Sequence, residues 1–147
     1  MYHPTKYYEG LSPAEKAKRK LEIEKFGAKK TGDPSAYVGF ATDKGVPTRK
    51  SNYSKAWEKL FPDAKSLPAR AKSSGVPVKF IRRCYNRGLV AWRTGHRPGA
   101  TQQQWGYARV ASFLLCGKTH YTADADLVEK AKAESKSAKK WFARCPK

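Results

Sequence analysis

The residues with the clearest chemical potential form a short loop at residues 93–99 (RTGHRPG). Its two glycines can adopt positive φ and expose backbone N–H groups, while two arginines and a histidine supply positive charge nearby. Amide groups at the start of a helix after Thr101 would add partial positive charge. The pattern predicts a loop that binds a phosphate or clamps an acidic side chain. The alternative is a solvated connection between two helices.

This loop lies within a segment of sixty residues, 64–123, that contains no Asp or Glu and holds eleven Lys and Arg residues. Folded surfaces usually mix both signs, because like charges repel each other. Arginine also suits two-pronged contact with phosphate or carboxylate. The segment therefore predicts an anionic partner. The candidate anion-binding or partner-binding residues are Arg82, Arg83, Arg87, Arg93, His96, Arg97 and Arg109.

The whole chain has 147 residues, a formal net charge of +19 and a hydrophobic content of 39%. This length suits one modest domain with arms. The charge favours nucleic acid, an anionic membrane surface or acidic faces of proteins as partners. The longest apolar run, Val110–Cys116, is too short to span a membrane, and Met1–Pro4 lacks the apolar region of a signal peptide. Three widely spaced cysteines predict reduced thiols in an intracellular protein.

Enzyme chemistry fits the sequence poorly. General acid–base catalysis and divalent-metal chemistry rely on carboxylates, and the segment 64–123 has none. His96 has no second histidine or acidic ligand at a useful spacing, and nothing local marks Cys84 or Cys116 as activated. We expect no enzyme, no catalytic residues, no metal site, no cofactor and no small-molecule substrate.

Apolar spacing and cap residues predict an all-α protein: a small helical body, an extended N-terminal arm and a C-terminal helix. Three regions are expected: 1–53 as an N-terminal helix and arm, 54–121 as the basic helical body, and 122–147 as the C-terminal helix. Within the first, residues 27–53 lack periodicity and suit a disordered linker or an arm that orders against a neighbour. Tyr37, Val38 and Phe40 favour the arm. Expected helices start at Ser12, Ser54, Ser66, Pro77, Thr101 and Thr122, with 118–121 extended.

The body contains a segment, Leu67–Cys84, that resembles a helix-turn-helix. Ala71 stands where the first helix packs closely on the second, and Gly75 stands in the turn. The second helix would enter the major groove of DNA with Lys79, Arg82 and Arg83. Arg70 and Ser74 depart from the motif, because they stand where buried apolar residues are usual. A plain helical hairpin is the alternative.

Two longer blocks resemble the signature of a protein family: 91–100 (AWRTGHRPGA) and 104–113 (QWGYARVASF). Shorter matches stand at 2–4 (YHP), 33–37 (DPSAY) and 42–45 (TDKG). The family is encoded by phycodnaviruses, which are large DNA viruses of algae, and by related giant viruses. The resemblance implies a viral origin and brings no catalytic residues to this chain.

By analogy, small basic proteins of this origin are similar to the minor capsid proteins that line the inner face of chlorella-virus-like shells. The first hypothesis is therefore a minor capsid component of the cement or scaffold type. It would be assembled inside the host cell, reside in the virion and bind major and minor capsid proteins. The second hypothesis is a virus-encoded protein that binds double-stranded DNA through a degenerate helix-turn-helix. A membrane surface stays open as a partner, without insertion.

Overall fold

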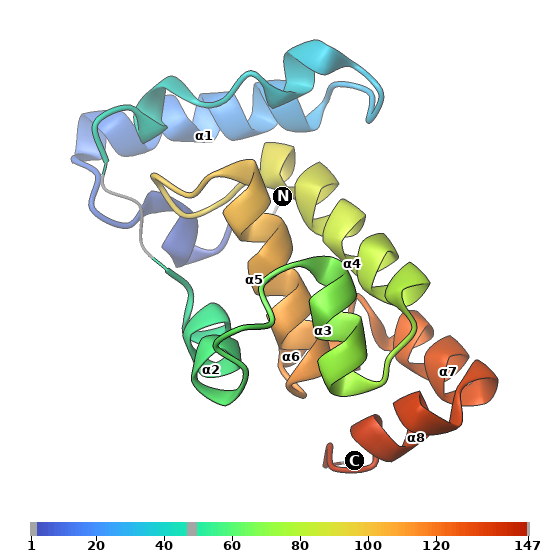
Figure 1. Ribbon diagram of the computed structural model, residues 1–147. Coiled ribbons are helices and arrows are strands. Elements are labelled where there is room, and N and C mark those ends of the chain that lie inside the picture. Colours follow the sequence, from blue (N-terminus) through green and yellow to red (C-terminus); the bar gives the residue numbers. More distant parts are fainter. Residues whose placement is uncertain (1–2, 47–49, 147) are drawn as a thin grey trace. The chain divides into compact units, whose positions relative to one another are not determined.

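The structure is a computed structural model that describes residues 3–46 and 50–146 (Figure 1). Within these residues the regular structure is helical, which confirms the all-α prediction. The expectations for Met1 and Tyr2, and for residues 47–49 of the predicted arm, concern positions outside the described ranges. None of the helices in the described part of the chain has the length and apolar character needed to cross a lipid bilayer.

The chain divides into two compact units. Unit 1 comprises residues 1–49 and 89–105, and unit 2 comprises residues 50–88 and 106–147. Both boundaries in the middle of the chain fall inside helices, α4 (Val78–Ala91) and α5 (Gln102–Leu114). The loop 93–99 therefore belongs to the same unit as the N-terminal residues. The predicted basic body at 54–121 had included this loop.

Unit 1 is built on α1 (Pro13–Gly27). Ser12 accepts a hydrogen bond from the backbone of Glu15 and the Glu15 side chain accepts one from Ser12, so the predicted capping box is present. Short 3-10 helices complete unit 1. Before α1 comes η1 (Thr5–Tyr8), and after it come η2 (Pro34–Tyr37) and η3 (Ala41–Asp43). The last, η4 (Trp92–Thr94), leads into the loop 93–99.

Residues 27–46 do not form the predicted extended arm. The Phe40 ring stacks between Phe26 of α1, at 5.4 Å, and Trp92 of η4, at 6.0 Å. Ala36 and Phe40 are buried. Phe40 was one of the apolar residues that favoured an arm docked on a neighbour. It packs within its own unit instead.

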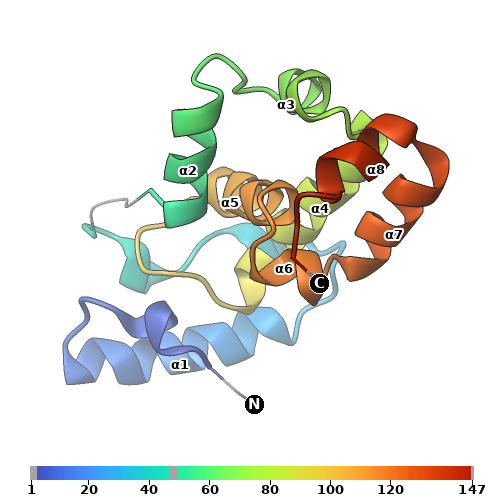
Figure 2. The same ribbon diagram turned by 90° about the horizontal axis from the view of Figure 1, so that it is seen from below.

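Unit 2 contains the larger apolar core. It comprises the parts of α4 and α5 already named together with α2 (Asn52–Leu60), α3 (Leu67–Ser74), α6 (Lys118–Tyr121), α7 (Ala125–Glu134) and α8 (Lys136–Phe142). Figure 2 shows α8 beside α7 and α3, with which it is in contact. The core side chains include Trp57, Phe80, Ile81, Phe113, Leu114, Leu127, Trp141 and Phe142. The indole N–H groups of Trp57 and Trp141 donate to the carbonyls of Ala64 and Leu114, so burial leaves neither group unsatisfied.

Several predicted helix ends differ from the observed ones. Ser51, and not Ser54, caps α2 by accepting from the Ser54 amide. Residues 118–121 form the short α6 instead of an extended segment. The predicted C-terminal helix is two helices, because Ser135 is extended, ends α7 and caps α8 through the Ala138 amide.

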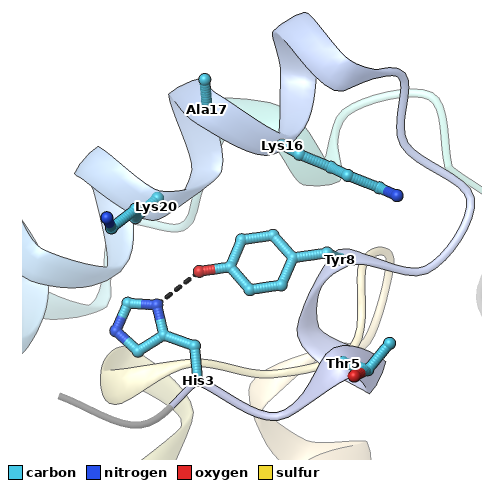
Figure 3. A pocket seen from close by; sticks show the side chains of 6 residues that line it. All are labelled: His3, Thr5, Tyr8, Lys16, Ala17 and Lys20. Atoms are coloured by element: carbon cyan, nitrogen blue, oxygen red, sulfur yellow. Dashed lines mark hydrogen bonds between the residues drawn. The ribbon is translucent and has the colours of Figure 1, made fainter.

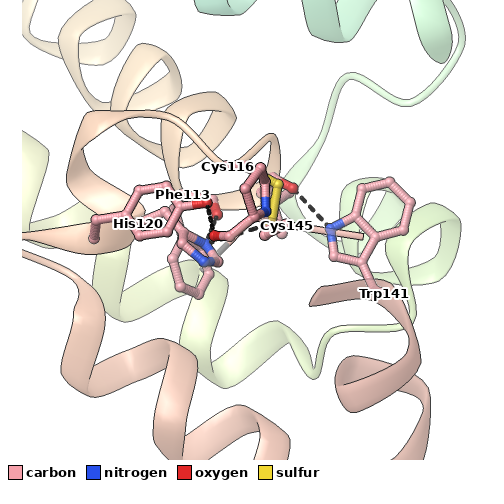
Figure 4. The surroundings of a disulfide bond; sticks show 8 residues. Phe113, Cys116, His120, Trp141 and Cys145 are labelled. Carbon is pink, nitrogen blue, oxygen red and sulfur yellow. Dashed lines mark hydrogen bonds between the residues drawn. A yellow bond between two sulfur atoms is a disulfide. The ribbon is translucent and has the colours of Figure 1, made fainter. Parts of the chain in front are cut away.

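The cysteine prediction is wrong for two of the three residues. Cys116 and Cys145 form a disulfide with a Cα–Cα distance of 5.3 Å (Figure 4). Cys84 is the free thiol and is buried in the unit 2 core. The two bonded residues are 29 positions apart in sequence, and only the packing of α8 on the end of α5 brings them together.

Candidate nucleic-acid interface

The loop 93–99 contacts its own chain with each of its basic residues. The Arg93 guanidinium donates to the Gly27 carbonyl at 2.8 Å, where it satisfies the C-terminal end of α1. Arg97 Nε lies 3.2 Å from Glu9 Oε2. Gly95 has φ +134°, and a Cβ at this position would lie 2.4 Å from the Tyr7 ring, so the loop needs glycine there.

His96 is fully buried in unit 1, between the rings of Trp92 and Phe40 at 4.4 and 4.6 Å. Its Nδ1 lies 2.8 Å from the Trp92 carbonyl and its Nε2 lies 2.6 Å from Asp43 Oδ2. Both neighbours are hydrogen-bond acceptors when Asp43 is ionised. Both contacts are hydrogen bonds only if each ring nitrogen carries a proton.

Asp43 is the centre of this network. Besides His96, it accepts from the Arg19 guanidinium at 2.8 Å and from the Gly99 amide at 3.0 Å. Burial would raise the pKa of Asp43, but the hydrogen bond and charge of His96, with the charge of Arg19, hold that pKa below its usual range. The loop thus clamps an acidic side chain, one of the two predicted roles, and the carboxylate comes from the chain itself. Sequence reasoning missed Asp43 and Arg19, which lie 24 residues apart with no local pattern joining them.

A second carboxylate, the fully buried Asp124, stands in unit 2. Arg109 binds it with two parallel hydrogen bonds of 3.0 and 2.9 Å, and Arg87 adds a third at 3.2 Å. Arg87 also pairs with Asp126 through two bonds of 2.8 and 2.7 Å, which lower the pKa of Asp126 to about 2. The Cys84 thiol donates to Asp124 at 3.4 Å, and burial with this nearby charge raises the pKa of Cys84. Such a thiol is not an activated nucleophile.

Five of the seven candidate residues are therefore engaged inside the chain: Arg87, Arg93, His96, Arg97 and Arg109. Four acidic partners stand outside the segment 64–123 in the sequence, and folding brings them to it. They are Glu9, Asp43, Asp124 and Asp126. These five residues therefore already have partners within the chain, and an external anion would have to compete with them. Acidic residues that are distant in the sequence thus lie beside basic residues of the segment 64–123 in the folded protein.

Arg82 and Arg83 behave differently. Both are exposed on α4, and no acidic side chain of the described residues pairs with either of them. Lys79, one turn earlier, forms an ion pair of 2.5 Å with Glu134, but both side chains are about half exposed. Such an exposed pair contributes little and is readily exchanged for another anion.

The turn between α3 and α4 lies where the sequence predicted it. Gly75 ends α3 in the left-handed conformation, with φ +83°, and its amide donates to the Ala71 carbonyl at 2.8 Å. Ser74 is buried, donates to the Arg70 carbonyl at 2.8 Å and accepts from the Val76 amide. Arg70 is also buried, stacks on the rings of Trp57 and Tyr107, and donates to the Lys65 carbonyl. The two positions that departed from the motif thus occupy buried sites, as the motif requires.

The start of α8 extends the basic character of this region. The Ser137 hydroxyl donates to the Gly75 carbonyl at 2.5 Å, so the helix begins directly against the hairpin turn. Its neighbours Lys136, Lys139 and Lys140 are exposed. We call the four exposed basic residues of α3 and α4 the hairpin surface: Lys72, Lys79, Arg82 and Arg83. In the described residues no group of three or more His, Cys, Asp or Glu is placed to hold a metal ion.

Comparison with known proteins identifies the family. A comparison with curated proteins finds no match, and a comparison with solved structures finds none either. One family profile matches residues 4–130, which is most of the chain and includes the loop, the hairpin, Asp43 and Asp124. The protein belongs to the family of unknown function DUF5824.

Proposed function

We propose that this protein binds double-stranded DNA through the hairpin surface of unit 2. The observation that carries the proposal is the exposure of Arg82 and Arg83 on the second helix of a helix-turn-helix-like hairpin, without acidic partners in the described residues. In that motif the N-terminal part of the second helix enters the major groove. Arginine at such a position can contact guanine edges or phosphates with two hydrogen bonds.

The charge of unit 2 supports this role. Its sequence contains 19 Lys and Arg residues but only six Asp and Glu residues. Of these six, Asp124, Asp126, Glu58 and Glu134 are already paired with basic side chains. The excess positive charge therefore faces solvent, where it attracts a polyanion and speeds encounter with it.

The proposal is tested by measuring the affinity of the full chain for a fluorescent DNA duplex between 50 and 200 mM salt. A protein with several phosphate contacts loses affinity steeply as salt rises. The variant Arg82→Glu/Arg83→Glu is expected to bind at least tenfold more weakly, because each lost contact is worth roughly 1–3 kcal/mol. Its helicity by circular dichroism should stay unchanged, since both side chains are exposed.

The matched control is Lys55→Glu/Lys59→Glu, which makes the same change of net charge on α2, also in unit 2. It should retain most of the affinity. Equal losses in both variants would show that bulk charge, and not the hairpin surface, holds the duplex. Absence of duplex binding at 50 mM salt would reject the proposal outright.

A second proposal is a role as a minor capsid component. Its support is the resemblance of residues 91–100 and 104–113 to proteins of large algal viruses, together with two exposed apolar side chains of unit 1. Leu21 is 67% exposed and Val38 is 73% exposed, and a partner that covered them would bury apolar surface. Mass spectrometry of virions from a virus that encodes the protein should find the chain in the capsid fraction. Its absence there would exclude this role.

A further inference from the structure

A hollow in unit 1 combines several hydrogen-bond donors and has no acidic side chain in its lining. It has a volume of about 540 Å³ and is lined by His3, Thr5, Tyr8, Lys16, Ala17 and Lys20 (Figure 3). The segment before α1 supplies three of these residues, and the first turns of α1 supply the others. The hollow is largely open to solvent, so a ligand would lie against its lining without being enclosed.

The two lysines stand one turn apart on α1. Neither forms an ion pair with an acidic side chain of the described residues. Like charges at this spacing destabilise a helix by a few tenths of a kcal/mol. An anion bound near these ammonium groups would reduce that repulsion. Figure 3 shows the two ammonium groups pointing to opposite sides of the Tyr8 ring.

The side chains of His3 and Tyr8 add a further donor. Tyr8 Oη is hydrogen-bonded to His3 Nδ1. Burial raises the pKa of Tyr8, so its hydroxyl keeps the proton and can donate it to Nδ1. With Nδ1 as the acceptor of this hydrogen bond, Nε2 is the ring nitrogen that can donate. This Nε2 is shielded from solvent and finds no hydrogen-bond partner in the described residues, which is a costly arrangement for a polar group.

We infer that this hollow is a binding site for a phosphate group. Lys16 and Lys20 supply two positive charges, and the Thr5 hydroxyl can donate a hydrogen bond. A phosphate that displaces the cover over His3 Nε2 would also give that atom a partner. A phosphate offers several acceptor oxygens and a charge near −2, which matches a site made of donors and cations. Because the hollow is open, a sugar or similar group attached to the phosphate can extend into solvent, so a phosphomonoester is the expected class of ligand. The site is independent of the hairpin surface, which belongs to the other unit.

The test is titration calorimetry of the full chain with adenosine monophosphate and with inorganic phosphate, and with adenosine as the uncharged control. Both phosphates are expected to bind, and adenosine is not. The variant Lys16→Ala/Lys20→Ala should weaken phosphate binding at least tenfold. The control Lys18→Ala/Lys30→Ala removes two exposed lysines of the same unit that do not line the hollow, and it should change affinity less than twofold.

Duplex binding by the same variants separates two sources of the phosphate. Retention of duplex affinity in Lys16→Ala/Lys20→Ala, with loss of adenosine monophosphate binding, supports a free phosphomonoester. A selective loss of duplex affinity in that variant assigns the site to a phosphate of nucleic acid. The inference is overturned if neither phosphate binds at millimolar concentration and duplex affinity is unchanged, or if the control variant loses as much. These outcomes do not depend on Arg82 and Arg83, so the two proposals fail separately.

Discussion

At the scale of single residues, two carboxylates, the half-buried Asp43 and the buried Asp124, organise the protein. Asp43 in unit 1 contacts Arg19 and His96, and Asp124 in unit 2 binds Arg87 and Arg109. An ion buried with its partners is costly to leave unpaired, whatever the net contribution of the intact pair. The residues that looked most functional in the sequence, His96 and Arg109 among them, are therefore required by these carboxylates.

Replacement of Asp43 by Asn should reduce the free energy of unfolding by about 3–5 kcal/mol, because Arg19 would stay buried without its counter-charge. Urea titration at pH 7 measures this loss. Asp33→Asn is the matched control, because Asp33 is a partly exposed cap of η2 and its replacement should cost at most about 1–2 kcal/mol. Equal losses in the two variants would contradict a central role for Asp43.

The same residue gives a pH dependence. The folded-state pKa of Asp43 lies below its ordinary value, so its contribution to stability is present above that ordinary value, near 4. The contribution is lost as the pH falls through the lower, folded-state pKa. Asp43→Asn should therefore lose less stability than the native chain when the pH is lowered from 5 toward 2.

At the scale of elements, the contact between α4 and α5 in unit 2 depends on glycine residues. An ideal Cβ on Gly88 of α4 would lie 2.7 Å from the Cα of Gly106 in α5. This distance is shorter than real Cβ contacts allow, and the opposing atom is backbone that cannot turn aside. The close approach of α4 and α5 explains why both helices carry glycine in their interiors, where it is otherwise unfavourable.

Gly88→Ala should therefore destabilise the protein by roughly 1–3 kcal/mol, although alanine is the better helix former. Gly27→Ala is the control: its new Cβ would meet its nearest neighbour, the Thr94 Cα, at an ordinary 3.9 Å. Thermal or urea unfolding should show a loss for the first variant and little change for the second. A gain in stability for Gly88→Ala would show that the helices are not in contact there.

At the scale of the whole molecule, a disulfide cross-links the chain, and positive charges outnumber negative ones. The disulfide between Cys116 and Cys145 closes a loop of 29 residues within unit 2. The remaining positive charge is concentrated on exposed side chains of that unit, which is the basis of the proposed DNA binding. The cross-link fixes the end of α8, whose first residues lie against the hairpin turn.

Loss of this disulfide in Cys116→Ser/Cys145→Ser should lower the free energy of unfolding by about 3–4 kcal/mol, as the chain-entropy estimate gives for a loop of this length. Addition of a thiol reductant should lower the free energy of unfolding of the native chain by a similar amount and leave that of the variant unchanged. Urea titration with and without reductant measures both effects. If the native chain is insensitive to reductant, the cross-link does not contribute to stability.

The sequence by itself determined the secondary structure class and the better-marked helix starts. The Ser12 capping box, the Ser66 cap and the Gly75 turn are local signals, and each acts through hydrogen bonds between residues no more than four positions apart. The hairpin 67–84 was predictable for the same reason. The start of α2 was not predictable in this way, because Ser51 and Ser54 can each cap a helix and only packing selects one of them.

Only the tertiary structure decided which charges are available to a partner. The pairing of Arg87 and Arg109 with Asp124, the burial of His96 beside Asp43, and the joining of Cys116 to Cys145 all link residues that are distant in sequence. Electrostatic attraction acts through space, so a run without acids can be neutralised by acids from elsewhere in the chain. Folding paired three of the six candidate arginines with carboxylates, joined Arg93 to backbone carbonyls, and left Arg82 and Arg83 exposed. This selection defines the proposed interface.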